Sequence, residues 1–277
     1  STQTQKYPSF FYGTAWKQDR TEELVVNAVC AGFKAIDTAN QLKHYNEPHV
    51  GQALASLFKQ GVQREFLFLQ TKFTSVDRQD HRLPYDPKDS ISNQVKQSFE
   101  SSLKHLNTDY IDSYLLHRPY NHPGLGKEDW EAWGAIEELY SSQKAKAIGV
   151  SNVNINQLKL FCEKAKVKPM AVQNRCFAVT GWDYEVREYC KTNNITYQGF
   201  SLLTANPNVL ATPQVLAAAN RLQITPEQTI LCFARQIGMV PLTGTSQEKH
   251  MKEDLHAMTL KLTSDELQTI ERIEIDS

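Results

Sequence analysis

Three side chains that can take part in acid–base chemistry stand directly after apolar, β-rich segments of the sequence: Asp37, Lys72 and His117. A fourth apolar run ends in Ser151 and Asn152, which offer hydroxyl and amide groups. Strands buried on both faces read as continuous apolar runs, and where they alternate with helices the residues at their carboxyl ends meet at one rim. The sequence therefore predicts a single active site, suited to proton transfer, at the carboxyl ends of the strands.

Each of these residues taken alone also has an ordinary structural explanation. Asp37 could cap a turn, Lys72 could be a solvated amine at a strand end, and His117 could be a loop histidine. Lys72 could also form a Schiff base, as in a barrel lyase or aldolase. An acid, an amine and an imidazole at three consecutive strand ends favour a catalytic set over three coincidences. No histidine spacing matches a metal site, so no metal is expected.

Alternating strands and helices are predicted along the whole chain. This pattern predicts an α/β fold, a (β/α)8 TIM barrel, as one domain over residues 1–277. An open doubly wound sheet is the alternative, but no Gly-x-Gly-x-x-Gly motif follows the first strand. The predicted strands are 10–15, 33–38, 65–71, 110–116, 146–150, 170–173, 195–200 and 239–242; the predicted helices are 20–31, 47–60, 87–106, 127–142, 155–165, 183–193, 212–237 in two pieces, 247–257 and 263–275.

Composition narrows the class of partner. The formal net charge is -1, with acids and bases mixed along the chain, which gives no electrostatic footprint for nucleic acid or for anionic lipid. No apolar run approaches the roughly 18 residues of a membrane-spanning helix. The five cysteines are odd in number and widely spaced, as expected for reduced thiols in a protein core. We therefore expect a cytoplasmic monomer that acts on a small molecule.

Short motifs occur in a fixed order from the first predicted strand to the last. They are GTAWK (13–17), IDTA (36–39), YNE (45–47), QTK (70–72), LHRP (116–119), IGVSN (148–152), QN (173–174) and GTS (244–246). In this order they resemble the aldo-keto reductases. The resemblance implies an enzyme that reduces an aldehyde or ketone to an alcohol, with a hydride from a nicotinamide cofactor and a proton from a tyrosine.

The same resemblance gives each catalytic residue a role. A free phenol has a pKa near 10, so the tyrosine needs a neighbouring ammonium, and Lys72 would supply it. Asp37 would hold and neutralise that lysine, and His117 would orient the carbonyl oxygen of the substrate. The resemblance places Trp16, His44, His117 and Arg118 at the substrate.

The tyrosine departs from the family pattern. The usual form is Asp-Thr-Ala-x-x-Tyr-x-Asn-Glu, whereas two additional residues separate Asp37 from Glu47 here. Counting from Asp37 places Leu42 in the tyrosine position, and counting back from Glu47 places His44 there. Tyr45 is the only phenol within reach and is our predicted proton donor, with His44 as its rival. A displaced donor also leaves open a redox sensor or scaffold that binds a nicotinamide nucleotide with little or no turnover.

The resemblance also implies the cofactor site. Many family members carry Pro-Lys-Ser where this chain has Pro241-Leu242-Thr243, and His250 stands near the position of an arginine that grips the 2′-phosphate of the cofactor. NADPH is the family default and NADH the alternative. Ser151, Asn152 and Gln173 would bind the nicotinamide carboxamide, and Phe200 would stack on its ring. The remaining predicted cofactor residues are Thr14, Ala15, Asp37, Ser201, Leu202, Gly244, Thr245, Ser246, His250 and Asp254.

Overall fold

The computed structural model describes residues 7–274, and in this range eight parallel strands close into a barrel. Each strand pairs with the next in sequence, and β1 pairs with β8 to complete the ring. The predicted (β/α)8 barrel is confirmed. The strands are β1 (Phe11–Gly13), β2 (Ala35–Asp37), β3 (Phe68–Phe73), β4 (Ser113–Leu116), β5 (Ile148–Ser151), β6 (Ala171–Arg175), β7 (Thr196–Phe200) and β8 (Val240–Thr243).

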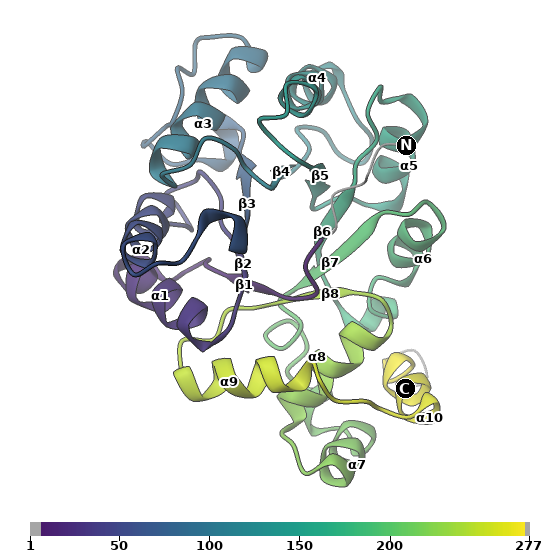
Figure 1. Cartoon of the computed structure of the whole chain (residues 1–277). Helices are drawn as coiled ribbons and strands as arrows, with labels where there is room; N and C mark the ends of the chain where they lie inside the picture. Colours follow the sequence, from purple (N-terminus) through teal and green to yellow (C-terminus); the bar gives the residue numbers. More distant parts are fainter. Residues whose placement is uncertain (1–6, 275–277) are drawn as a thin grey trace.

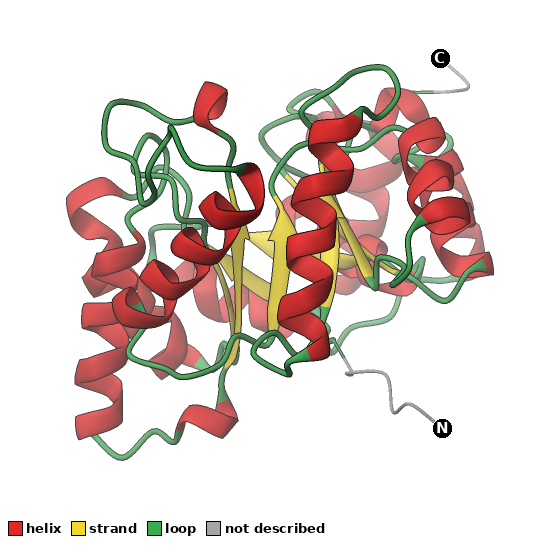
Figure 2. Ribbon diagram, turned by 90° about the horizontal axis from the view of Figure 1, so that it is seen from above, coloured by secondary structure: helices red, strands yellow, loops and turns green. Residues whose placement is uncertain are grey.

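Helices surround the strands, as Figure 1 shows, and Figure 2 shows the strands inside this helical layer. The α-helices are α1 (Thr21–Ala31), α2 (Glu47–Lys59), α3 (Ile91–His105), α4 (Lys127–Ser141), α5 (Ile155–Lys164), α6 (Tyr184–Thr192), α7 (Pro213–Leu222), α8 (Pro226–Gln236), α9 (Glu248–Ala257) and α10 (Ser264–Glu271). Short 3-10 helices are η1 (Gln18–Arg20), η2 (Arg64–Phe66), η3 (Val76–Arg78), η4 (Ala178–Thr180) and η5 (Val209–Ala211).

The predicted elements differ from the observed ones at their ends, by four residues at the start of α3 and at the end of α10. The helix predicted to begin at Pro87 begins only at Ile91, because the Ser90 hydroxyl caps it by accepting from the backbone N–H of Asn93 at 3.2 Å. The side chain of Gln94 donates to the carbonyl of Pro87 and so holds the preceding segment outside the helix. The last predicted helix is observed as α10, which ends at Glu271, four residues before the predicted end at residue 275; residue 275 itself lies outside the described residues.

The strand register lines up polar side chains on neighbouring strands. Asp37 on β2 stands opposite Gln70 on β3, which stands opposite Ser113 on β4. On the other side of the barrel, Gln173 on β6 stands opposite Gln198 on β7. All five side chains are buried. The barrel interior therefore contains a layer of polar side chains, in which Gln70 and Gln173 donate hydrogen bonds to Asp37.

Apolar side chains pack the helices against the barrel and against each other. Trp133 of α4 contacts Phe161 of α5 with ring centroids 5.4 Å apart, and Trp182 contacts Phe233 of α8 at 5.1 Å. Four of the five cysteines are buried and Cys30 is exposed, so the expected core placement was wrong for that one residue. Within residues 7–274, no helix has the length and apolar character needed to cross a bilayer.

Gly51 of α2 allows this helix to approach α3 closely. A Cβ at Gly51 would lie 1.5 Å from the carbonyl oxygen of His105, so Gly51→Ala must push the two helices apart. We expect a loss of about 3 kcal/mol in the free energy of unfolding, measured by urea denaturation. Gly134→Ala on α4 is the control: its Cβ meets nothing within 4 Å, and a gain of about 0.5–1 kcal/mol is expected. Equal stability of Gly51→Ala and the wild type would contradict this close packing.

Candidate active site

Asp37 and Lys72 form a buried ion pair at the carboxyl ends of β2 and β3. The Nζ atom of Lys72 lies 2.9 Å from both carboxylate oxygens and 2.9 Å from the Thr38 carbonyl oxygen. Burial alone would lower the pKa of Lys72, but the negative charges of Asp37 and of ionised Tyr45 outweigh it and raise the pKa. Lys72 is therefore an ammonium at neutral pH, which does not suit the nucleophilic amine that a Schiff base requires.

Two glutamine side chains hold the carboxylate of Asp37, and a third glutamine holds those two. The Nε2 atoms of Gln70 and Gln173 each lie 2.9 Å from Oδ1 of Asp37. Both also donate to Oε1 of Gln198, at 2.7 and 3.0 Å. These bonds fix the carboxylate that in turn fixes Lys72. The sequence analysis quoted Gln70 only as part of the QTK motif and gave it no role, and it missed Gln198, although each is a polar residue inside an apolar run.

Tyr45 lies beside the ion pair. The Lys72 ammonium is 5.1 Å from the centroid of its ring, and the centroid of the His117 ring is 5.8 Å from it. Burial raises the pKa of Tyr45, and the positive charge of Lys72 opposes this rise. The phenol therefore holds its proton at neutral pH. The structure brings together all four predicted catalytic residues: Asp37, Tyr45, Lys72 and His117.

His44 and Leu42, the other residues in the displaced tyrosine region, lie elsewhere. The His44 ring packs against Trp16, which lines the cavity, with centroids 4.3 Å apart and the ring planes tilted by 37°; neither His44 nor Leu42 lines the central cavity itself. Burial and the charge of Lys43 lower the pKa of His44, so its imidazole is neutral near pH 7. The two additional residues are accommodated in the turn before α2, and Asn46 caps this helix.

His117 is neutral and oriented by a hydroxyl. Burial, followed by the positive charges of Lys72 and Arg118, lowers its pKa well below the ordinary value. Its Nδ1 atom is 2.7 Å from the hydroxyl oxygen of Thr74. The sequence analysis missed Thr74, which follows Lys72 by two positions and therefore follows the same strand, β3. The side-chain amide of Asn152 donates to the His117 carbonyl at 2.9 Å.

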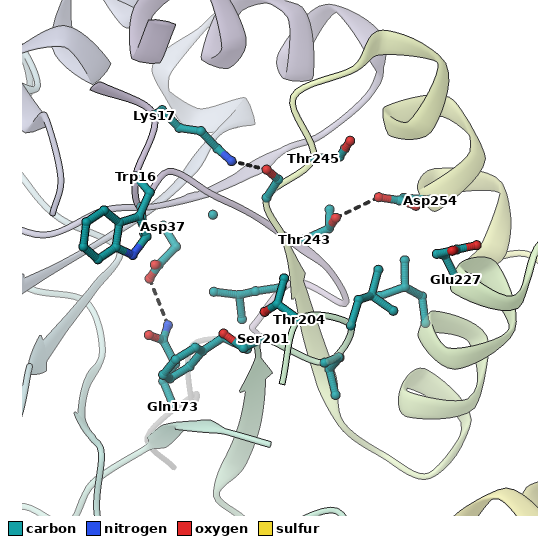
Figure 3. Close-up of a pocket in the computed structure, with 18 of the residues that line it drawn as sticks. Trp16, Lys17, Asp37, Gln173, Ser201, Thr204, Glu227, Thr243, Thr245 and Asp254 are labelled. Atoms are coloured by element: carbon teal, nitrogen blue, oxygen red, sulfur yellow. Dashed lines mark hydrogen bonds between the residues drawn. The ribbon is translucent and has the colours of Figure 1, made fainter. Parts of the chain in front are cut away.

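A cavity of about 580 Å³ runs from Asp37, Tyr45 and His117 to helices α8 and α9. Figure 3 shows part of its lining, including Asp37 and residues of both helices. Of the predicted site residues, Ala15, Trp16, Asp37, Tyr45, His117, Ser151, Asn152, Gln173, Phe200, Ser201, Leu202, Gly244, Thr245, His250 and Asp254 line it. Thr14, His44, Lys72, Arg118 and Ser246 do not, although Thr14 donates to the Asp37 carbonyl and Lys72 lies directly behind the wall. Lining residues that were not predicted are Gly13, Lys17, Leu203, Thr204, Thr225, Glu227, Leu231, Leu242, Thr243 and Glu253.

The cavity wall contains backbone in a strained conformation. Trp16, Asn152 and Ser201 all line the cavity and have φ angles of 62°, 58° and 56°. Residues other than glycine rarely adopt backbone angles in this left-handed region, and such strain concentrates at functional sites. The wall near Asn152 is further fixed by Ser151, whose hydroxyl donates to the Gln173 carbonyl at 2.7 Å.

The sequence of the whole barrel matches one family model. The model of the aldo/keto reductase family matches residues 9–275. The chain belongs to this family. Glyoxal reductase from Bacillus subtilis (strain 168) is 30% identical over 255 residues, which cover 92% of this chain and 83% of that protein. The uncharacterized oxidoreductase YtbE of the same organism is 31% identical over 250 residues, 90% of this chain and 82% of its own length.

Solved structures agree with the family assignment of this aldo/keto reductase. MGS-M4, an aldo-keto reductase enzyme from a Medee basin deep-sea metagenome library, superimposes with a TM-score of 0.83 at 25% identity. The match covers 98% of this chain and 93% of MGS-M4. The family and the oxidoreductases among its relatives support an oxidoreductase.

Proposed function

We propose that this aldo/keto reductase reduces small aldehydes or ketones to alcohols with NAD(P)H. The observation that carries the proposal is the convergence of Tyr45, Lys72, Asp37 and His117 at the inner end of one large cavity. The cavity volume of about 580 Å³ is in the range of cofactor and small-molecule sites.

The residues present fit a nicotinamide nucleotide. Ser151, Asn152 and Gln173 offer polar groups beside Tyr45, and Phe200 offers an aromatic face. At the other end, the loop after β8 leads into the amino terminus of α9, a position where free backbone amides favour phosphate. When bound there, a reduced nicotinamide would supply the hydride.

The protein's own side chains supply the proton that completes the reduction. The Thr74 hydroxyl lies 2.7 Å from Nδ1 of His117, and a hydrogen bond donated by this hydroxyl would leave the proton of the neutral imidazole on Nε2, available to the carbonyl oxygen of the substrate. The phenol of Tyr45 gives its proton to the oxygen as negative charge develops there. The ammonium of Lys72 stabilises the phenolate that remains, and Asp37 keeps that ammonium in place.

The proposal is tested by mixing the purified protein with NADPH or NADH and each of a panel of aldehydes, ketones and quinones, and measuring how fast the nucleotide is consumed. We expect oxidation of the nucleotide that depends on the carbonyl substrate. Binding of nucleotide without oxidation by any substrate would instead support the sensor or scaffold, which rested on the displaced tyrosine. The position of Tyr45 beside Lys72 favours turnover.

The hydrogen bond between Thr74 and His117 gives a prediction of its own. Thr74→Val removes the hydroxyl with little change in shape, and we expect kcat/KM to fall about tenfold because the imidazole loses its fixed tautomer. The affinity for nucleotide should not change. Thr38→Val is the matched control, since its buried hydroxyl has no hydrogen-bond partner among the described residues. An equal effect of both substitutions on kcat/KM would rule out a specific role for Thr74.

A further inference from the structure

Three arginines lie near the carboxyl ends of strands in the part of the rim that contains His117. Arg78 ends η3, which follows β3, while Arg118 follows β4 and Arg175 ends β6. Strands β3 to β6 succeed one another around one side of the barrel (Figure 1), so their carboxyl ends share one part of the rim. All three residues are exposed. We call them the arginine cluster.

Arg175 projects toward the side of β6 that faces the barrel interior. It follows Gln173 by two positions, and the side chain of Gln173 reaches Asp37 inside the barrel. Alternate residues of a strand face the same side, so Arg175 shares the side of Gln173. The guanidinium carbon of Arg175 lies 5.6 Å from the centroid of the Phe200 ring, and Phe200 lines the cavity.

The charges of the arginine cluster act on one another and on His117. Partial burial, followed by the positive charges of Arg78 and Arg175, lowers the pKa of Arg118. The charges of Arg118 and Arg78 also contribute to the lowered pKa of His117. Effects of this kind arise between charges that lie a short distance apart. None of the three arginines lines the cavity, so this positive charge lies just outside the wall that His117 forms.

The positive charge of the arginine cluster is largely uncompensated. Within residues 7–274, the guanidinium groups of Arg118 and Arg175 form no hydrogen bond or ion pair with another residue. Arg78 has one acidic neighbour, Asp77, whose carboxylate oxygen is 3.8 Å from Nε in a half-exposed pair. The charge of Asp77 also opposes the lowering of the pKa of Arg118. Three guanidinium groups thus face one carboxylate, and the excess positive charge attracts an anion.

The position of the arginine cluster points to the substrate as the source of that anion. If the proposed function holds, a dinucleotide extends along the cavity from Tyr45 and His117 toward α8 and α9. The carbonyl group of the substrate must then lie between the nicotinamide and these two side chains. The remainder of the substrate extends toward the part of the rim that the nucleotide leaves open, where the arginine cluster lies.

We propose that Arg118 and Arg175 bind a carboxylate of the substrate, so that the preferred substrates are aldehydes or ketones that carry a carboxylate group. A guanidinium presents its N–H donors as a planar fork that fits the two oxygens of a carboxylate. Asp77 favours a carboxylate over a phosphate, because it repels the two negative charges of a phosphate more strongly than one. This inference rests on the proposed function and narrows its class of substrate.

Pairs of substrates that differ in one charge test the inference. The pairs are 3-carboxybenzaldehyde, 4-carboxybenzaldehyde and the flexible 4-oxobutanoate, each with its methyl ester, reduced by the full chain at pH 7 and low salt. For at least one pair we expect kcat/KM to be about tenfold or more higher for the acid, mainly through a lower KM, because hydrogen bonds to a charged group are strong. Added salt should reduce this ratio, since it screens exposed charges.

The double variant Arg118→Gln with Arg175→Gln should bring the acid-to-ester ratio of kcat/KM close to one. Both side chains are exposed and make no hydrogen bond within residues 7–274, so the variant should fold. Arg221→Gln with Lys96→Gln is the matched control, because it removes the same charge at exposed positions of α7 and α3 outside the cavity lining. The control should leave the ratio unchanged.

Three results would count against the inference. Reduction of every acid and its ester with equal kcat/KM by the wild type would overturn it while the proposed function stands. An equal effect of the two double variants on the ratio would also overturn it, since net charge alone would then explain the preference. Failure of every carbonyl compound to oxidise either nucleotide would refute the proposed function and the inference together.

Discussion

Tyr45→Phe should lower kcat/KM for carbonyl reduction by about 10²–10⁴-fold, the contribution typical of a positioned general acid. The substitution removes one hydroxyl and keeps the ring beside Lys72 and His117. The affinity for nucleotide should therefore remain that of the wild type. Steady-state kinetics with the best carbonyl substrate, together with a nucleotide titration, separate these two effects.

The pH dependence adds a second readout for Tyr45. Its pKa is raised above the ordinary value of 10, so the phenol holds its proton from neutral pH up to that raised value. Reduction by the wild type should lose its proton donor only as the pH rises through the folded-state pKa. The Phe variant should lack this alkaline decline.

His44→Phe is the matched control for Tyr45→Phe. His44 packs against Trp16 and lies outside the cavity lining, so an aromatic replacement should retain most of the activity. If His44→Phe abolished reduction and Tyr45→Phe did not, the imidazole would be the proton donor and the proposed assignment would be wrong.

Lys72→Met should cost about 3–5 kcal/mol in the free energy of unfolding and also suppress catalysis. The substitution leaves the carboxylate of Asp37 buried with only the amides of Gln70 and Gln173 as hydrogen-bond donors. Removing one member of a buried ion pair has this cost because the remaining charge is no longer compensated. Urea denaturation measures the loss in stability.

Two further variants test whether the loss arises from the unpaired charge. Lys72→Met combined with Asp37→Asn should recover much of the stability, because asparagine is neutral and still accepts from the two glutamines. It should recover none of the activity. Lys96→Met removes an exposed lysine from a surface pair with Glu138 and should change stability by about 0.5 kcal/mol or less. A loss in the double variant as large as in Lys72→Met would contradict the account.

Much of this site could be predicted from residues at strand ends. Asp37, Lys72 and His117 each follow an apolar run, and the topology of a parallel barrel requires such residues to share one rim. The choice of Tyr45 over His44 depends on the path of the turn before α2, which two additional residues alter. Sequence spacing alone could not resolve that path.

One physical reason explains why the sequence analysis gave no role to several residues of the site. Gln70 and Gln198 look like interruptions of apolar strands, and only the register of the closed barrel reveals that both connect to Asp37. Glu227 and Glu253 belong to separate amphipathic helices, where a carboxylate normally faces solvent. Their place at one end of a cavity depends on how α8 and α9 pack, which local patterns do not encode.

Transfer of deuterium tests the central claim most directly. The purified protein is given a reduced nicotinamide nucleotide labelled with deuterium at the hydride position, together with an aldehyde or ketone, and the alcohol is analysed by mass spectrometry and NMR. The account predicts deuterium on the former carbonyl carbon, formed by the wild type and largely lost with Tyr45→Phe. Tight binding of the nucleotide with no labelled alcohol from any carbonyl compound would contradict it.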